Sequence, residues 1–257
     1  MNHPDPVAVS AEPPRKVNWP SVALYYFTAC AISWPLFWWR DLHPDSWQHW
    51  ALRGLFKGLL PALGPLTGCL LALLIFRRAH RRTISLLGTS VVKSALFTAI
   101  PLGVLAALGV GDSKPHLTGA VLGCMSLVYA IGEEAGWRGF LHDALRPLGD
   151  GRRALIIGLL WGTWHFTTFV SGGFAASAGR LAIMYCAWIA ASWLMGKAAD
   201  LTRSLVVAAM LHLVFNFVLG FPPKVWITVL AVSIPCWVYL LFRWRRGSSR
   251  ELSVITD

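Results

Sequence analysis

Six polar residues that can take part in hydrolytic chemistry lie inside otherwise apolar stretches of the chain. A charged or unpaired polar side chain in hydrocarbon costs roughly 2.5 to 3.5 kcal/mol, so each of them needs a partner or a function. Of the twelve acidic residues, only one adjacent pair of glutamates lies well inside an apolar stretch. The six residues are Glu133, Glu134 and Arg138 in IGEEAGWRGF, His165 in WGTWHFTTF, and His212 and Asn216 in MLHLVFN.

The spacing of these residues predicts which side chains can meet. Glu134 and Arg138 are four residues apart, so they lie one above the other on a helix and are expected to form an ion pair. Glu133 is rotated by about 100° from Glu134 and faces elsewhere. His212 and Asn216 are also four apart, so one helical face presents an imidazole beside an amide. At about 1.5 Å rise per residue from the flanking basic residues, all six share one depth near the membrane midplane.

These residue types suit the hydrolysis of an amide or ester by an activated water. A carboxylate in a low-dielectric site beside an imidazole can hold and deprotonate a water, and Glu133 with His165 is the predicted pair. His212 and Asn216 can donate hydrogen bonds to the oxyanion that forms when water adds to a carbonyl. The sequence has no GxSxG motif, so a serine nucleophile on a nucleophile elbow is not expected.

Each residue also has a purely structural interpretation. Glu134 and Arg138 can be an ion pair that positions one helix, His165 can be a core histidine, and His212 with Asn216 can be an interhelical hydrogen-bonding pair. Glu133 is explained least well in this way, because Arg138 neutralises only one of two adjacent carboxylates. The structural interpretation needs three separate explanations at one depth, whereas a site needs one.

The elements that carry these residues are predicted to be membrane-spanning helices. The chain has 257 residues, 56% hydrophobic and 14% charged, against roughly 25% charged in soluble domains. Its apolar stretches are near the length that crosses about 30 Å of hydrocarbon. We therefore predict an all-α, polytopic membrane protein with about eight transmembrane helices. The predicted spans are 20–39, 55–76, 93–111, 117–142, 154–171, 181–199, 204–220 and 224–242.

The basic residues predict the orientation of these helices. The net charge of +11 would suggest nucleic acid in a soluble protein, but here the charges lie between apolar stretches and indicate lipid contacts instead. With the N-terminus inside, the inner segments hold sixteen Lys and Arg and the outer segments six. Both termini are therefore expected in the cytosol, in a multi-pass membrane protein with a site that faces the cytosol.

The chain divides into one domain with two short ends. Residues 1–16 are predicted to be a disordered tail, 17–246 a single transmembrane domain, and 247–257 a cytosolic tail. His142, near the end of the fourth span, is interpreted as solvated. The tryptophans are interpreted mainly as lipid-facing or interfacial residues without a chemical role.

The three motifs resemble those of the CPBP family of intramembrane proteases, the CAAX-processing and bacteriocin-processing group also called ABI, and in detail a bacterial branch. The family pattern is EExxxR, then FxxxH, then HxxxN or HxxxD, and the likeness is strongest over about 115 to 220. Trp161 stands where the second motif usually has Phe and preserves an aromatic wall. The matching segments are EEAGWR from Glu133 to Arg138, WGTWH ending at His165, and HLVFN from His212 to Asn216.

The resemblance implies an intramembrane endopeptidase that cuts a membrane-associated protein or peptide, with a prenylated CAAX-like protein among the substrate classes. It implies Glu133 as the base with His165, and Glu134 with Arg138 as the supporting pair. It also implies an oxyanion site, made by His212 and Asn216. The likeness to a bacterial branch implies a location in a bacterial inner membrane. The alternative is a non-catalytic immunity or regulatory protein that binds a peptide in the same cavity. A proton-coupled transporter is less favoured, because no inverted repeat is evident.

Metal dependence is a separate question. Family members are often labelled metalloproteases, although a metal-free glutamate mechanism has been proposed. The chain lacks HExxH, so we expect no obligatory cofactor. Zinc is the alternative, held by Glu133, His165 and His212 as a site with one carboxylate and two histidines.

Overall fold

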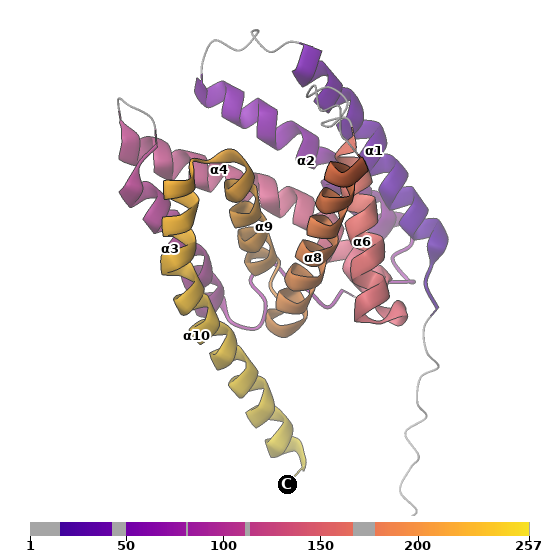
Figure 1. The fold of residues 1–257 in the computed structure, drawn as a ribbon. Coiled ribbons are helices and arrows are strands. Elements are labelled where there is room, and N and C mark those ends of the chain that lie inside the picture. Colours follow the sequence, from indigo (N-terminus) through magenta and orange to yellow (C-terminus); the bar gives the residue numbers. More distant parts are fainter. Residues whose placement is uncertain (1–15, 43–49, 81, 111–113, 167–177, 257) are drawn as a thin grey trace, which may run out of the picture.

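The computed structural model describes residues 16–42, 50–80, 82–110, 114–166 and 178–256, and within these ranges the protein is helical without a named strand. This confirms the all-α prediction. Eight long helices account for most of the described residues (Figure 1). They are α1 (Trp19–Leu42), α2 (Trp50–Ile75), α3 (Val91–Leu108), α4 (Pro115–Gly136), α6 (Asp150–Trp164), α8 (Ala178–Thr202), α9 (Leu205–Gly220) and α10 (Pro223–Thr256).

Each predicted span overlaps one of these long helices. Four helical segments of the described residues are long and apolar enough to cross a membrane, which supports an integral membrane protein. The number of membrane crossings stays a prediction. The fifth predicted span runs to residue 171, whereas α6 ends at Trp164, and residues 167–177 and 1–15 lie outside the described part of the chain. The four segments are Val91–Leu108, Pro115–Ala144, Ala178–Thr202 and Pro223–Arg246.

The fourth predicted span is a continuous helix with one widened turn. After α4 the chain continues as a π-helical segment, η1 (Trp137–Leu141), and then as α5 (His142–Ala144). The backbone N–H of His142 donates to the carbonyl of Trp137, which is the five-residue spacing of a π-helix. Such widened turns often occur at functional sites. A short 3-10 turn, η2 (Arg146–Leu148), connects α5 to α6.

Small residues let α1 and α2 approach each other and α4. Gly64 and Gly68 lie four residues apart on α2, so both face α1. A Cβ at Gly64 would lie 2.0 Å from Ser33 Oγ, and one at Gly68 would lie 2.5 Å from the Tyr25 carbonyl oxygen. On α4, a Cβ at Gly136 would lie 2.5 Å from the Tyr25 hydroxyl. Backbones can approach this closely only where the side chain is a hydrogen atom.

The start of α9 is fixed by the chain segment that precedes α3. The backbone N–H of Ser85 donates to the Arg203 carbonyl at 2.9 Å, and the Leu205 N–H donates to the Ser85 carbonyl at 2.9 Å. Ser204 caps α9 by accepting the N–H of Val207. These bonds hold the turn between α8 and α9 and thereby set the register of the helix that carries the third motif.

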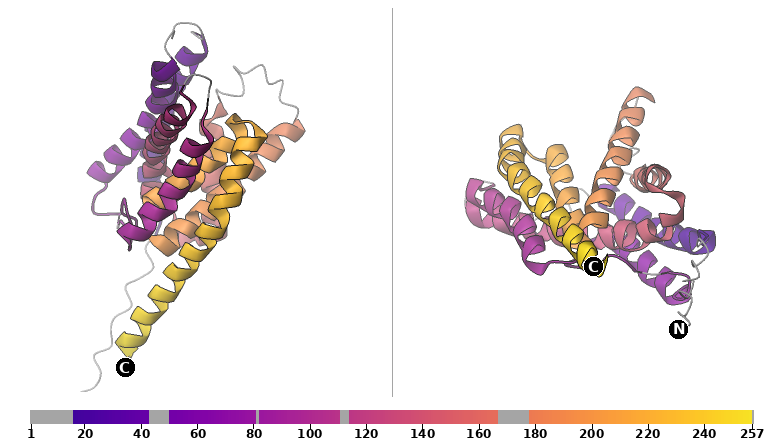
Figure 2. Two further views of the ribbon diagram at one scale, coloured as in Figure 1. Left: turned by 90° about the vertical axis from the view of Figure 1, so that its left-hand side faces the viewer. Right: turned by 90° about the horizontal axis from the view of Figure 1, so that it is seen from below.

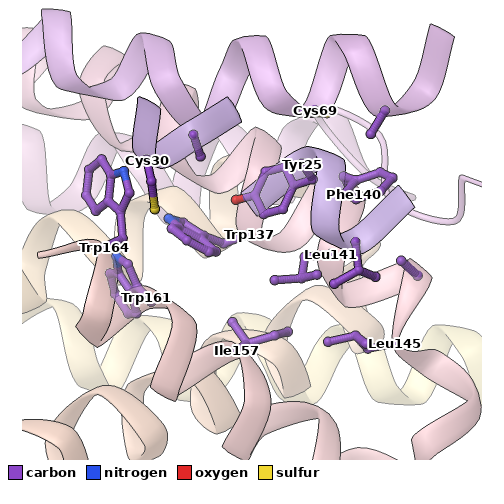
Figure 3. Close-up of a cluster of buried hydrophobic side chains, with 14 of the residues drawn as sticks. Tyr25, Cys30, Cys69, Trp137, Phe140, Leu141, Leu145, Ile157, Trp161 and Trp164 are labelled. Atoms are coloured by element: carbon purple, nitrogen blue, oxygen red, sulfur yellow. The ribbon is translucent and has the colours of Figure 1, made fainter. Parts of the chain in front are cut away.

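Two apolar clusters are joined by the fourth helix. The first combines side chains of α1, α2, η1, α6 and α8 and contains Tyr25, Trp137 and Trp161 (Figure 3). The second combines α3, α4, α8, α9 and α10, and in it Phe97 stacks on Trp237 with ring centroids 4.6 Å apart. Because η1 contributes to the first cluster and α4 to the second, the first motif lies between them.

The close approach of α1 and α2 predicts that Gly64→Val and Gly68→Val destabilise the protein by about 1 to 3 kcal/mol, the usual cost of overpacking. Gly103→Val is the matched control, because a Cβ at that helical position of α3 would meet nothing within 4 Å. Thermal unfolding in detergent measures the difference. Equal unfolding temperatures for all three variants would contradict this account of the α1–α2 contact.

Candidate active site

Glu134, Arg138 and His212 form a buried polar cluster where α4, η1 and α9 meet. Arg138 Nη1 lies 2.8 Å from Glu134 Oε1, and this is the ion pair that the four-residue spacing predicts. His212 Nδ1 lies 2.8 Å from the same oxygen. The side chains of Glu134 and Arg138 are fully buried. Arg138 also reaches α8, where Nη2 donates to Ser192 Oγ at 3.4 Å.

Glu133 faces away from this ion pair and is held by two tryptophans. Trp161 Nε1 donates to Glu133 Oε2 at 3.0 Å, and Trp137 Nε1 donates to the same oxygen at 3.4 Å. The other carboxylate oxygen, Oε1, is buried and has no hydrogen-bond partner among the described residues. His212 Nε2 lies 4.0 Å from Oε2, beyond hydrogen-bond distance. His212 therefore lies between the two glutamates and bonds one of them.

His165 is the C-terminal cap of α6, and its ring is half-buried. His165 Nδ1 lies 3.1 Å from the Trp161 carbonyl oxygen. A carbonyl only accepts, so Nδ1 donates this hydrogen bond. The ring stacks on Trp188 of α8, with centroids 5.4 Å apart. Trp161 connects His165 to Glu133. Its backbone carbonyl accepts a hydrogen bond from His165, and its indole N–H donates a hydrogen bond to Glu133.

The interpretation of the tryptophans as residues without a chemical role is wrong for two of them. Trp137 and Trp161 are almost fully buried and bond the carboxylate of Glu133. The spacing of these two tryptophans from the motif residues could have indicated their contact with the site, although the amino-acid composition could not. Trp137 lies four residues after Glu133, on the same helical face, and Trp161 lies four residues before His165. An apolar classification of tryptophan overlooks its N–H donor.

His142 is also placed differently from the sequence interpretation, because it is buried rather than solvated. It lies one turn after Arg138, and its Nε2 is 3.2 Å from Asp200 Oδ1 on α8. Asp200 in turn pairs with Arg153 of α6 at 2.6 Å and with Arg146 of η2 at 3.1 Å. This polar network ties together α5, η2, α6 and α8 beside the ion-paired cluster.

At the outer edge of this network, Asp150 bonds Arg153 at 2.6 Å and also pairs with Lys197 of α8. The hydrogen bond from Lys197 lowers the pKa of Asp150 below its ordinary value.

On the loop after α2, burial lowers the pKa of His80, whose Nε2 lies 2.8 Å from Ser21 Oγ. These groups hold helices together and take no part in the contacts around the glutamates.

The six predicted residues differ in how closely they contact the buried cluster. Four of them lie in one buried cluster around the two carboxylates, and a fifth, His165, is connected to it through Trp161. The sixth, Asn216, is half-buried on α9, one turn after His212. The four clustered residues are Glu133, Glu134, Arg138 and His212.

The donor set does not fit the alternative zinc site. No group of three or more His, Cys, Asp or Glu side chains in the described ranges is arranged to hold a metal ion. A catalytic zinc typically has three protein ligands, so the combination of Glu133, His165 and His212 lacks the required convergence.

The buried ion pair predicts that Arg138→Ala lowers folded yield and unfolding temperature. It strands the carboxylate of Glu134, a change worth about 3 to 5 kcal/mol. The control is Arg152→Ala, because Arg152 is exposed on α6. Size-exclusion profiles and thermal unfolding in detergent measure both variants, and wild-type stability of Arg138→Ala would contradict the supporting role of the pair.

The segment that contains the site can be compared with known proteins. Residues 115–218 match the family model described as type II CAAX prenyl endopeptidase Rce1-like. No curated protein matches the chain. The matched segment runs from α4 into α9 and includes all six predicted site residues. The match supports the CPBP family that the three motifs resemble, and over this segment the chain is similar to CAAX prenyl endopeptidases.

Proposed function

We propose that the protein is an intramembrane endopeptidase of a bacterial CPBP branch that hydrolyses a peptide bond in a membrane-associated, CAAX-like protein or peptide. The observation that carries the proposal is Glu133, a fully buried carboxylate that forms no ion pair with Arg138 and keeps one oxygen without a partner among the described residues. It lies inside the segment that matches the CAAX prenyl endopeptidase family.

The proposed reaction uses the free oxygen of Glu133 as the base. Glu133 Oε1 removes a proton from water, assisted by His165, and the oxygen of that water adds to the substrate carbonyl carbon. The carbonyl oxygen becomes an oxyanion. When the C–N bond breaks, the oxyanion returns to a carbonyl and the proton held by Glu133 passes to the leaving amine. The products are a carboxylic acid and an amine, which exchange a proton to become a carboxylate and an ammonium group, and Glu133 returns to its starting state.

Asn216 and His212 are the proposed donors to the oxyanion. The amide of Asn216 can donate directly. Glu134 accepts a hydrogen bond from His212 Nδ1, so donation to the oxyanion from Nε2 requires the imidazolium form. Donors aimed at charge that develops in the transition state typically supply several kcal/mol of stabilisation.

An apolar cavity of about 670 Å³ between α8, α9 and α10 supports a substrate with a lipid chain. Leu211 and Phe215 of α9 line it and are the sequence neighbours of the third motif. On α10, Leu230 and Trp237 form the opposite wall. A prenyl group is one chain of the matching size and polarity.

The alternative is an immunity or regulatory protein that binds a peptide in the same cavity without turnover. Such a protein gains nothing from burying a second carboxylate beside Glu134, and the burial is costly. The intact set of polar residues therefore favours the enzyme.

The proposal includes a cytosolic location of both termini, with the lipid bilayer as the surrounding partner. The excess of Lys and Arg in the inner segments supports this orientation. Helix α10 has 34 residues, about 51 Å, and it projects beyond the other helices at its C-terminal end (Figure 2). That end carries Arg243, Arg245 and Arg246, which suit a cytosolic surface.

Reporter fusions test the orientation. Fusions after Arg82 and after Arg246 are expected to report the cytosol, and a fusion near Lys114 is expected to report the external side, since basic segments stay inside. An external signal at the Arg77–Arg82 cluster would contradict the arrangement.

Glu133→Gln tests the proposed activity. We expect peptide release to fall by at least about 100-fold, because the amide keeps the shape of the carboxylate and cannot act as a base. The measurement compares the new peptide ends in membranes that carry wild-type or variant protein. The folded yield of the variant serves as the control. Wild-type amounts of cleavage products in Glu133→Gln would exclude Glu133 as the base.

Treatment with a chelator tests metal dependence. We propose that no metal is obligatory, so the stripped protein is expected to retain cleavage at close to the untreated rate, since Glu133 supplies the base. Bound metal and peptide cleavage are measured on the same detergent-purified sample. Stoichiometric zinc, with activity lost on stripping and restored by zinc alone, would establish the metalloprotease alternative.

A further inference from the structure

The two oxygens of the Glu133 carboxylate are in different environments. Oε2 accepts indole N–H groups from Trp161 at 3.0 Å and from Trp137 at 3.4 Å. Oε1 is buried without a hydrogen-bond partner in the described part of the chain. The terminal torsion of glutamate is broad and roughly two-fold, so an unrestrained carboxylate exchanges its oxygens readily. Here two donors from different elements, η1 and α6, both bond Oε2 and thereby fix the orientation of the carboxylate.

The indole of Trp161 is itself held by other residues of the site. The guanidinium carbon of Arg138 lies 4.9 Å from the centroid of the Trp161 ring. The ring of His212 contacts it at 4.9 Å in an edge-to-face arrangement with an interplanar angle of 74°. Trp161 is 1% exposed, so the ring has no room to rotate.

The indole of Trp137 is held on the other side of Glu133. It packs edge-to-face against Tyr25 of α1 at 5.5 Å, and Figure 3 shows the two rings beside each other. Trp164 contacts it at 6.0 Å. The packing around both indole rings therefore directs their N–H groups toward Oε2 of Glu133.

We propose that Trp161 and Trp137 are positioning residues of the hydrolysis, a pair of indole donors that occupies Oε2 and leaves Oε1 as the oxygen of Glu133 that accepts the proton of the water. The inference rests on the proposed endopeptidase function. Indole suits this task because its N–H only donates and does not titrate, so it neither competes for the proton nor exchanges roles with the base.

Trp161→Phe tests the proposal, because it retains a buried aromatic ring and removes the shorter of the two bonds. A hydrogen bond to a charged group corresponds to about 10-fold to 100-fold in a rate or equilibrium constant. We expect kcat to fall by that factor with KM within about twofold of wild type. The probe is a synthetic peptide containing the bond that wild-type membranes cleave and Glu133→Gln membranes do not.

Trp244→Phe is the matched control. Trp244 is buried on α10 in the second apolar cluster, and its N–H donates to Thr89 Oγ1 at 3.2 Å. The substitution removes the same atoms and a hydrogen bond without touching Glu133 or the apolar cavity. We expect lower thermal stability and a kcat within about twofold of wild type.

Replacement of Trp161 by benzothienylalanine separates shape from hydrogen bonding, since this analogue keeps the bicyclic ring and replaces the N–H by sulfur. A loss of kcat equal to that of Trp161→Phe supports the proposal. Wild-type kcat with the analogue, or equal losses in Trp161→Phe and Trp244→Phe, would overturn it. If Trp161→Phe does not fold, the protein with the analogue still tests the hydrogen bond to Glu133.

A measurement on the bond itself keeps this inference distinct from the proposed function. The indole 15N–1H resonance of Trp161, assigned by its absence in Trp161→Phe, is expected to shift in Glu133→Gln, because an amide oxygen is a weaker acceptor than a carboxylate. An unchanged resonance would overturn the indole pair even if wild-type protein cleaves its substrate. A shifted resonance in a protein that cleaves nothing supports the bond and overturns the proposed function alone.

Discussion

Two adjacent carboxylates buried among apolar helices are the constraint on which the rest of this structure depends. Consecutive residues of a helix differ in direction by about 100°, so the arginine that pairs with Glu134 does not also pair with Glu133. The protein resolves this with two kinds of partner. Glu134 receives an arginine and an imidazole on one oxygen, whereas Glu133 receives two neutral indole N–H donors on one oxygen. The second oxygen of each carboxylate has no hydrogen-bond partner among the described residues, and only that of Glu133 belongs to a carboxylate without an arginine.

The surrounding helices are placed so that these partners can reach the carboxylates. Close contacts at Gly64, Gly68 and Gly136 bring α1 and α2 against the helix that carries both glutamates. The π-helical turn of η1 contains Trp137 and Arg138, so both side chains leave the helix where its backbone is widened. The turn held by Ser85 sets the register of α9, which brings the His212 ring between the glutamates.

This division of partners also links the groups of the site to one another. Trp161 bonds one glutamate, contacts the guanidinium that neutralises the other, and packs against the histidine between them. A change at any one of these groups therefore alters the surroundings of the others, and substitutions among them are expected to be non-additive. A hydrolytic site benefits from such coupling, because a base that is fixed before the reaction requires no rearrangement during it.

The sequence by itself determined the helical class, the approximate limits of the long helices, and the residues of the polar cluster. These follow from the length of the apolar stretches and from the high cost of a charge in hydrocarbon, which makes residues such as Glu133 and Arg138 conspicuous. The pairing of Glu134 with Arg138 was also predictable, because both lie on one helix and the helical repeat fixes their relative direction.

Only the tertiary structure decided which groups on different helices meet. Sequence reasoning paired Glu133 with His165, and the structure shows that Trp161 bonds both of them and that His212 bonds Glu134. It also buries His142 against Asp200, although the position of His142 near a helix end had indicated solvent. Contacts between helices depend on the rotation and tilt of each helix in the bundle, and these are set by shape complementarity over many side chains. The period of a single helix contains no information about that rotation, so the two indole donors of Glu133 became visible only in the folded protein.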